Sequence, residues 1–306
     1  RVSLVPEVVQ ALIKMQVQVW VESNAGVLAF FNDDTYVNVG AVIKSRAEIL
    51  QQAQLILSIQ PENIAQDLPN DKTILGVYQP LFNAAQMQQW AQKNVTVFSL
   101  DTIPRTTRAQ AMDVLSSQAN IAGYKAVLLA ATQYCRYFPM FMTAAGSIPP
   151  AKVLILGAGV AGLQAIATAR RLGAVVEVFD TRPAVKEEVQ SLGAKFIEVE
   201  GAADASKAGG YAVEQSADFQ NRQRQRIHES AKKSDIIITT AQIPGRQAPI
   251  LITKEMIEDM RAGSVIVDLA ASTGGNTDYT KNNETVLQNG VTIIGNSALA
   301  ATASSD

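Results

Sequence analysis

The sequence is 306 residues long, and because a domain typically holds about 150 residues, we expect two domains. Its 26 Lys and Arg residues nearly balance its 28 Asp and Glu residues, which disfavours nucleic acid or an anionic membrane surface as a partner. A single cysteine excludes an internal disulfide and a single histidine leaves too few donors for zinc, so we expect metal-free chemistry in the cytosol.

The first part of the chain alternates short apolar runs with amphipathic stretches. The predicted strands are Gln16–Val21, Leu55–Ile59, Thr73–Tyr78 and Val95–Phe98. A helix is predicted between the last two, at Ala84–Lys93. This alternation is typical of a parallel sheet covered by helices, so residues 1–125 are expected to form a Rossmann-like domain.

A long stretch without turn residues follows. Arg105–Phe138 is rich in alanine and predicts one or two helices that cross to the second half of the chain, with residues 126–150 as crossing helix and linker. The most apolar stretch, Ala126–Ala145, is interrupted by Arg136 and Pro139. No apolar run reaches the roughly 18 residues that a membrane span needs, so this chain is not expected to enter a membrane.

The alternation resumes after Gly146 and the pair Pro149 and Pro150. The predicted strands are Val153–Leu156, Val175–Phe179, Lys195–Val199, Ile236–Thr239, Ser264–Asp268 and Val291–Ile294. They predict a second Rossmann domain over residues 151–306, so the expected fold class is α/β, with two doubly wound parallel-sheet domains joined by long crossing helices. Between Glu200 and Ala217 small residues replace the strand pattern, which is typical of a functional lid or a disordered loop.

The first of these strands is followed by glycines at the spacing G-x-G-x-x-G. Gly157 permits a tight turn, Gly159 lets a pyrophosphate approach the backbone, and Gly162 lets the next helix pack closely on the strand. That helix, Val160–Leu172, offers its first amides to the phosphates. The residues expected to bind a dinucleotide here are Gly157, Ala158, Gly159, Val160 and Gly162.

Asp180 ends the next strand, about 20 residues after the glycines, where a carboxylate can accept the ribose hydroxyls. Such a carboxylate repels the 2′-phosphate of NADP, which favours NAD(H) as the cofactor. Arg182, two residues later, could instead attract that phosphate, so the residues alone leave NADP(H) open.

Further segments extend this interpretation beyond the glycine motif. They are Pro104–Lys125, Phe179–Pro183 with Gln190–Ala194, and Thr239–Gly245 with Gly263–Ala270 and Gly274–Asn276. Over nearly its whole length the sequence resembles the NAD(H)-binding component, domain I of the alpha subunit, of proton-translocating NAD(P) transhydrogenase, which is related to alanine dehydrogenase. The most specific segment holds Arg105, Gln110 and Asp113, because the family carries an Arg/Gln/Asp loop at this spacing beside the nicotinamide.

The resemblance implies a reaction between two nicotinamide nucleotides. NADH on this component would give a hydride directly to NADP⁺ held on a second component, domain III, while a membrane component couples the step to proton flow. Arg105, Asp113 and Ser116 would orient the nicotinamide end, and Gln110 would reach toward the partner's nucleotide. Such transfer depends on holding two rings close and aligned without water. Asp113 and Ser116 could instead only cap a helix, as Asp and Ser often do.

The resemblance also implies a lid, further contacts and an assembly. Tyr211 matches the aromatic residue of the family's mobile loop, which closes over the adenosine side. The remaining cofactor-binding residues are expected to be Thr181, Arg182, Gly210, Tyr211, Ala241, Gln242, Asp268 and Leu269. The family implies a homodimer in the cytoplasm, peripheral on the inner face of the membrane through its partner subunits. Because its members begin earlier and continue further, residues 1–125 are expected to form a domain that is incomplete at both chain ends.

Alanine dehydrogenase is the nearest alternative, because it shares the fold and many of these glycines. That activity needs a lysine and a histidine to bind and deprotonate a small amino acid. The matching positions here read Ser58–Glu62 and Gln79, and Ser272 stands in place of an aspartate. With His228 as the only imidazole, no group near the site has the neutral pKa that such a base requires.

A different alternative is a non-catalytic module that only binds NAD(H). It would keep the glycines and Asp180, but it would have no reason to keep the Arg105–Asp113 loop. The basic run Asn221–Lys233 lacks aromatic residues and predicts a solvated helix face, with His228 exposed, rather than a nucleic-acid site. Cys135, on the apolar crossing helix, is expected to be a small packing residue.

Overall fold

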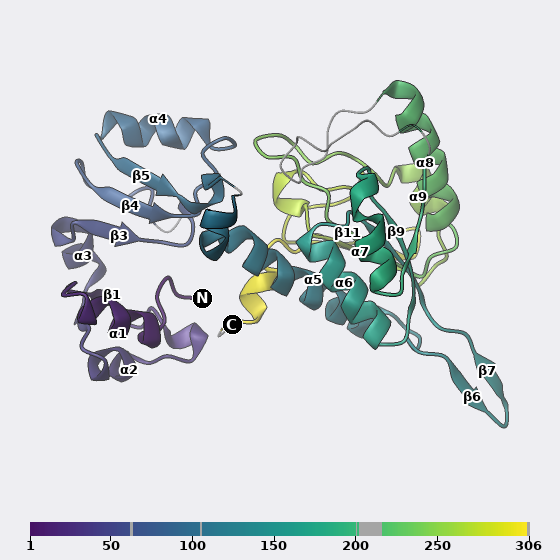
Figure 1. Cartoon of the computed structure of the whole chain (residues 1–306), viewed down its shortest axis with the longest axis horizontal. Helices are drawn as coiled ribbons and strands as arrows, with labels where there is room; N and C mark the ends of the chain where they lie inside the picture. Colours follow the sequence, from purple (N-terminus) through teal and green to yellow (C-terminus); the bar gives the residue numbers. More distant parts are fainter. Residues whose placement is uncertain (62–63, 105, 200, 202–215, 305–306) are drawn as a thin grey trace. The chain divides into compact units, whose positions relative to one another are not determined.

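The computed structural model describes residues 1–61, 64–104, 106–199, 201 and 216–304 (Figure 1). The chain divides into two compact units, Arg1–Leu115 with Ala303–Asp306, and Ser116–Thr302. Among the helices of the described residues, none combines the length and the apolar character that a membrane crossing requires.

The first unit contains small parallel sheets. Its strands are β1 (Trp20–Glu22) paired with β2 (Val42–Lys44), and β3 (Leu55–Leu57), β4 (Thr73–Gly76) and β5 (Thr96–Ser99) in that spatial order. Its helices are α1 (Pro6–Lys14), α2 (Asp33–Asn38), α3 (Arg46–Gln52) and α4 (Ala84–Gln92), with the 3-10 turns η1 (Val27–Ala29), η3 (Leu100–Thr102) and η4 (Thr107–Met112). The predicted alternation of parallel strands and helices is confirmed in this unit.

Each of these sheets has an apolar cluster of its own. Beside the three-stranded sheet, the rings of Tyr78 and Trp90 meet edge to face with centroids 5.3 Å apart, and both side chains are fully buried together with Leu68. Beside the two-stranded sheet, the buried Tyr36 donates its hydroxyl to the carbonyl oxygen of Leu4 at 2.8 Å. The first unit is therefore held by aromatic packing in addition to its short strands.

The second unit is built on a seven-stranded sheet with the order β10-β9-β8-β11-β12-β14-β13. The strands are β8 (Lys152–Leu156), β9 (Val175–Phe179), β10 (Lys195–Phe196), β11 (Ile236–Thr239), β12 (Val265–Asp268), β13 (Thr285–Gln288) and β14 (Val291–Ile294). Neighbours pair in parallel except β13, which runs antiparallel to β14 at the edge. Since β8 lies between β9 and β11, the chain proceeds outward in both directions from β8, as predicted for a doubly wound sheet.

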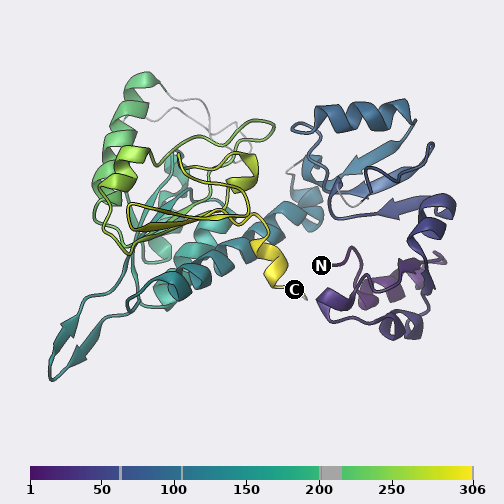
Figure 2. The ribbon, with the colours of Figure 1, turned by 180° about the vertical axis from the view of Figure 1, so that it is seen from behind.

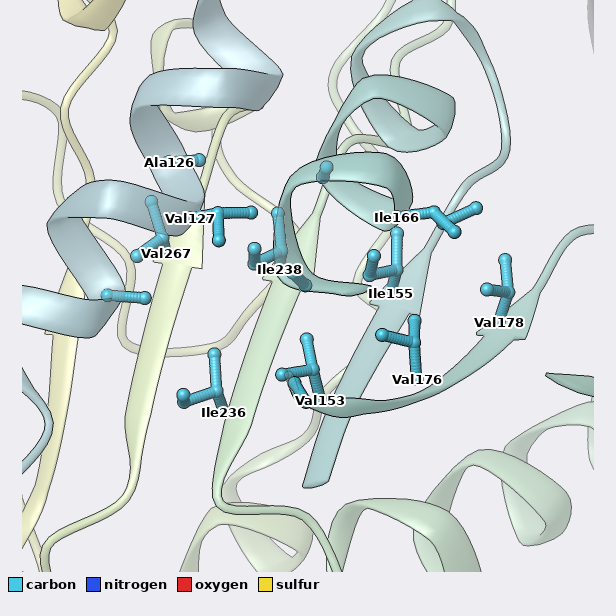
Figure 3. Close-up of a cluster of buried hydrophobic side chains, with 14 of the residues drawn as sticks. Ala126, Val127, Val153, Ile155, Ile166, Val176, Val178, Ile236, Ile238 and Val267 are labelled. Atoms are coloured by element: carbon cyan, nitrogen blue, oxygen red, sulfur yellow. The ribbon is translucent and has the colours of Figure 1, made fainter. Parts of the chain in front are cut away.

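Helices cover both faces of this sheet. They are α5 (Val114–Gln133), α6 (Val160–Arg171), α7 (Lys186–Ser191), α8 (Ala217–Ala231) and α9 (Lys254–Glu258), with the 3-10 turns η5 (Pro183–Val185), η6 (Ala271–Thr273) and η7 (Leu299–Thr302). Figure 3 shows Val127 of α5 and Ile166 of α6 over Ile155 and Ile238 of the strands. Helices α8 and α9 share the other buried cluster. Because both faces are buried, strands such as β11 are apolar at successive positions.

In the described part of the predicted crossing segment, the 3-10 turn η4 is followed by one α-helix, α5, of 20 residues. This helix packs tightly on α6 at Gly123, where an added Cβ atom would collide with the backbone carbonyl of Ala161. Ala161 lies in the first turn of α6. Helix α5 therefore supports the start of α6 directly.

The segment after α5 differs from the predicted linker. It contains a hairpin of β6 (Phe141–Thr143) and β7 (Gly146–Ile148), which Figures 1 and 2 show extending away from the sheet of its unit. Its side chains are exposed, Met142 to 78%. Cys135 is also exposed, so its predicted packing role is wrong. The reason is that α5 ends at Gln133, before the cysteine.

Candidate functional site

The carboxyl ends of four neighbouring strands meet at one edge of the large sheet. Leu156 of β8 is in register with Phe179 of β9 and Thr239 of β11, and Thr239 is in register with Asp268 of β12. The residues that follow these strands therefore lie side by side. Because β8 and β11 flank the point where the strand order reverses, this edge is where a doubly wound sheet binds its ligand.

Two of the three motif glycines are required by the packing of the chain itself. Gly157 has a φ of +105°, and an added Cβ atom would collide with the Oγ1 atom of Thr240. At Gly162, an added Cβ atom would collide with the carbonyl oxygen of Gly157. These two glycines therefore form the predicted tight turn and the predicted close contact between strand and helix.

Gly159 has no such internal reason to be a glycine. Its φ of −78° is available to any residue, and an added Cβ atom would find no atom within 4 Å. Gly159 is also the N-cap residue of α6, where no side chain caps the helix. The turn thus leaves open space beside Gly159 at the uncapped N-terminus of α6, which fits the pyrophosphate of a dinucleotide such as NAD(H).

Asp180 lies next to this turn with its side chain only 6% exposed. Its Oδ2 accepts a hydrogen bond from the N–H of Ala158 at 2.7 Å, and its Oδ1 accepts one from the N–H of Arg182 at 2.8 Å. The guanidinium of Arg182 also donates from Nε to Oδ1 at 2.9 Å and from Nη2 to Oδ2 at 2.7 Å. These hydrogen bonds raise the pKa of Arg182 above its usual value, against the opposing effect of its burial.

The pairing of Asp180 with Arg182 defines what a ribose would meet. The carboxylate is bonded both to the glycine turn and to the guanidinium, so ribose hydroxyls must share or displace the contacts from Arg182. Thr181, between them, is partly buried. The residues predicted from the sequence for the first half of the site, Gly157 to Arg182, are thus brought together.

On the other side of the switch point, Asp268 is completely buried. Its Oδ1 accepts from the N–H of Ala270 at 2.9 Å, and its Oδ2 accepts from the N–H of Asn276 and the hydroxyl of Thr280, both at 2.6 Å. Because the chain itself surrounds the carboxylate, Asp268 shapes the loop after β12. Its direct contact with a cofactor stays a prediction.

The other residues predicted on this side follow β11 and β12. Ala241 is partly buried and Gln242 is exposed, and the Nε2 of Gln242 donates to the carbonyl oxygen of Leu269 at 3.1 Å. The side chain that holds Ala241 is Asn276, which belongs to the run Gly274–Asn276 but was not predicted as a site residue. An asparagine beside paired glycines was the available signal, since its amide can bond a backbone N–H and a carbonyl at once.

The predicted loop near residue 110 belongs to the first unit up to Leu115. Gln110 is exposed on η4, and its carbonyl accepts from the N–H of Asp113 at 3.3 Å. Asp113 and Ser116 are half-buried at the start of α5. Three predicted site residues lie outside the described residues, namely Arg105, Gly210 and Tyr211.

Comparison with known families covers nearly the entire chain. Residues 1–122 match the family Alanine dehydrogenase/PNT, N-terminal domain, and residues 126–306 match Alanine dehydrogenase/PNT, C-terminal domain. The chain belongs to the alanine dehydrogenase/PNT family.

Members of the alanine dehydrogenase/PNT family differ in their similarity to this chain. An NAD(P) transhydrogenase alpha-subunit chain of Rickettsia prowazekii is 45% identical, covering 100% of this chain and 82% of the relative. NAD(P) transhydrogenase subunit alpha of Haemophilus influenzae is 46% identical, and the match covers 96% of this chain and 58% of the relative. Alanine dehydrogenase of Staphylococcus epidermidis is 28% identical, and the match covers 95% of this chain and 75% of the relative.

Solved structures of the alanine dehydrogenase/PNT family show the same fold. The transhydrogenase of Sinorhizobium meliloti has a TM-score of 0.89 and 43% identity, covering 100% of this chain and 84% of that one. An L-alanine dehydrogenase has a TM-score of 0.79 and 23% identity, and the match covers 99% of this chain and 82% of that one. The predicted α/β fold with Rossmann-like parallel-sheet domains is therefore confirmed.

An alanine dehydrogenase is expected to carry a lysine within the run Ser58–Glu62 and a histidine at Gln79. Ser58 follows β3 with its Oγ 3.0 Å from the hydroxyl of Tyr78, and both side chains are buried. Gln79 donates its N–H to Asp101 at 3.3 Å. The only imidazole, His228, lies on α8 of the other unit, where it is 36% exposed and 3.0 Å from Asp259. The run Ser58–Glu62 contains no lysine and position 79 is not a histidine, so the two groups of that enzyme are missing from the sequence.

Proposed function

We propose that this chain binds NAD(H) as the nucleotide-binding component of an NAD(P) transhydrogenase. The observation that carries the proposal is the open turn at Gly159, beside the carboxylate of Asp180, at the switch point of the large sheet. Relatives named as NAD(P) transhydrogenase alpha-subunit chains, at 45% and 43% identity over the whole chain, support the assignment to this enzyme.

The preferred cofactor is NAD(H) rather than NADP(H). A carboxylate offers only acceptors, which suit ribose hydroxyls and repel a 2′-phosphate. Arg182, the group that could attract that phosphate, directs its guanidinium at Asp180. The pair therefore presents little positive charge for NADP(H) to use.

The proposed reaction is direct hydride transfer. Bound NADH supplies the hydride, NADP⁺ held on the partner component accepts it, and the products are NAD⁺ and NADPH. No proton has to leave or reach a side chain of this chain, which agrees with the lack of a lysine in Ser58–Glu62 and of a histidine at position 79. The chain would contribute alignment and exclusion of water, with Asp113 and Ser116 orienting the ring.

The experiment that tests this function is a mixture of the chain with a purified NADP(H)-binding component. Hydride transfer between the two nucleotides can be followed with a nicotinamide analogue whose reduced form absorbs at a distinct wavelength. We expect transfer that depends on both proteins. Oxidation of alanine by this chain alone would contradict the proposal and favour the related dehydrogenase activity.

A shorter side chain at position 110 tests the predicted contact with the partner's nucleotide. We expect Gln110→Asn to slow hydride transfer about tenfold or more while NADH affinity stays nearly unchanged, because Gln110 is exposed and assigned to the second nucleotide. Stopped-flow absorbance gives the rate and NADH fluorescence gives the dissociation constant. The matched control is Gln92→Asn on the exposed face of α4, which should change neither. An affinity loss that accounts for the whole rate loss would contradict the role of Gln110.

The proposed assembly contains this component as a homodimer, together with the NADP(H)-binding component, domain III, and a membrane component that couples transfer to proton translocation. It would lie in the cytoplasm, peripheral on the inner face of the membrane. Residues 1–125 and 151–306 are proposed as its domains. The hairpin β6–β7 supports self-association, because Met140, Phe141 and Met142 expose apolar side chains on an element that is marginal alone in water.

A charge on this hairpin tests the homodimer. We expect Met142→Asp to convert a dimer to monomers without loss of folding, because the side chain is exposed and a charge disfavours an apolar interface. Sedimentation velocity measures the change. Leu287→Asp, a similar change at an exposed position of β13, should leave the dimer intact. A monomeric unmutated chain, or a dimeric Met142→Asp variant, would refute the role of the hairpin.

A further inference from the structure

Asn276 is a completely buried side chain that clamps a neighbouring backbone segment. Its Oδ1 accepts from the N–H of Ala241 at 3.0 Å. Its Nδ2 donates to the carbonyl oxygens of Ala241 at 2.9 Å and of Pro249 at 2.8 Å. The opposite orientation of the amide would oppose NH₂ to an N–H and oxygen to two carbonyls, so the contacts determine the orientation. Both polar backbone groups of Ala241 are therefore held by one side chain.

The backbone of Asn276 is itself anchored to the sheet. Its N–H donates to Oδ2 of Asp268, the last residue of β12, at 2.6 Å. Its carbonyl oxygen accepts from the N–H groups of Leu251 at 2.8 Å and Ile252 at 3.0 Å. The amide that holds Ala241 thus projects from a fixed support.

The segment held by Asn276 lies directly at the switch point. Thr240, the residue before Ala241, donates its N–H to the carbonyl oxygen of Leu156 at 2.9 Å, and its hydroxyl lies 3.3 Å from the carbonyl oxygen of Gly157. Residues 240 and 241 are therefore fixed on one side by the glycine turn and on the other by Asn276. They form the portion of the crevice that follows β11.

The strand order indicates which half of a dinucleotide this segment would contact. A doubly wound sheet is made of two mononucleotide-binding halves, with the ligand lying across the reversal of strand order. The glycine turn after β8 and Asp180 after β9 belong to the first half. Ala241 after β11 and Leu269 after β12 belong to the second, which receives the nicotinamide nucleotide.

We propose that Asn276 is a positioning residue for the nicotinamide half of the bound dinucleotide, acting through Ala241. It touches no ligand, because its side chain is completely buried. The inference rests on the proposed function only in requiring that a dinucleotide binds at this edge. Its consequence is that loss of the amide disturbs one half of the site and spares the other.

The experiment compares a whole dinucleotide with a fragment. The dissociation constant of NADH is measured by fluorescence, and that of ADP, which lacks the nicotinamide nucleotide, by competition or calorimetry. For Asn276→Ala and Asn276→Asp we expect the NADH constant to rise about tenfold or more and the ADP constant to change less than about twofold. Both variants are expected to lose the clamp on Ala241. Alanine has no polar side chain, and the carboxylate of aspartate cannot donate to the two carbonyl oxygens.

A second variant separates positioning from general loss of stability. Thr280→Val removes the hydroxyl that donates to Asp268 at 2.6 Å, so it loosens the same buried network without removing the amide on Ala241. We expect it to lower the melting temperature and to leave the ratio of NADH to ADP affinity unchanged. Asn221→Asp, at an exposed position of α8, controls for the added charge.

The outcomes that would overturn the inference are distinct from those that overturn the function. Unchanged NADH affinity in the Asn276 variants, or equal losses for NADH and ADP, would refute the positioning role. Failure of the unmutated chain to bind NADH would refute the proposed function itself. If the Asn276 variants do not fold, amide exchange in the unmutated chain still decides. Slow exchange at Ala241 without nucleotide is expected, and fast exchange there would refute the clamp.

Discussion

Replacing Asp180 with alanine is expected to weaken NADH binding by about ten- to a hundredfold, as for loss of charge-assisted hydrogen bonds of about 1.5 to 3 kcal/mol. The carboxylate holds the N–H of Ala158 in the glycine turn as well as the guanidinium of Arg182. Its removal therefore loosens the turn that is proposed to face the pyrophosphate and removes the proposed acceptor for the ribose hydroxyls. Fluorescence titration with NADH measures the change.

The same substitution is expected to weaken discrimination against NADPH. Without the carboxylate, the guanidinium of Arg182 loses its ion pair at 2.7 Å, so its charge is less well neutralised and attracts a 2′-phosphate more strongly. Asp180→Asn is the matched control for shape, since it keeps an acceptor for Ala158 but loses the charge that pairs with Arg182. Equal affinity of the unmutated chain for NADH and NADPH would contradict the role assigned to Asp180.

Two glycine-to-alanine substitutions in the glycine motif are expected to change different properties, one the stability of the protein and the other its affinity for NADH. Gly162→Ala should lower the free energy of unfolding by about 1 to 3 kcal/mol or more, because the added methyl group collides with the carbonyl of Gly157. Gly159→Ala should leave stability nearly unchanged, because the structure has open space there. It should nevertheless weaken NADH binding about tenfold or more, because the methyl group enters the space assigned to the pyrophosphate.

Thermal unfolding and NADH titration of both variants separate these effects. A stable Gly162→Ala protein would show that the helix can move away from the strand at no cost. A Gly159→Ala protein with unchanged NADH affinity would remove the main support for a pyrophosphate at this turn. The two measurements therefore test the packing argument and the binding argument independently.

The strands of the large sheet could be predicted because they are buried on both faces and read as unbroken apolar runs. Val153–Leu156, Val175–Phe179 and Ile236–Thr239 all lie within or match the observed strands. The glycine turn could be predicted for the same physical reason, since its residue types follow from backbone geometry. The local sequence pattern is therefore sufficient to predict an element when burial or backbone conformation restricts which residue types can occupy its positions.

Other elements could not be predicted, because their signal is short or distant in sequence. Strand β2, Val42–Lys44, has three residues, too few for a recognisable alternation. Strand β1 begins at Trp20, later than the predicted start at Gln16. The hairpin β6–β7 has exposed apolar side chains, which contradict the usual pattern of a half-buried strand.

The polar groups of the site show the same limit. The pairing of Arg182 with Asp180 joins residues two apart, yet the sequence left open whether the arginine would face the carboxylate or a phosphate. The clamp between Asn276 and Ala241 joins residues 35 positions apart and depends on the register of β11 with β12. Such contacts are determined by tertiary packing, which local spacing does not encode.

The contact between Gly123 and Ala161 has a consequence for anyone who wishes to redesign the cofactor preference of this fold. Helix α6, which begins at the glycine turn, packs against α5 at Gly123. A side chain larger than hydrogen at this position would collide with the backbone of α6. In a saturation screen, position 123 should therefore tolerate as little variation as the G-x-G-x-x-G fingerprint, although it precedes that fingerprint by more than thirty residues. Libraries that vary the start of α6 need to hold Gly123 constant, because its backbone contact sets how far that helix can shift.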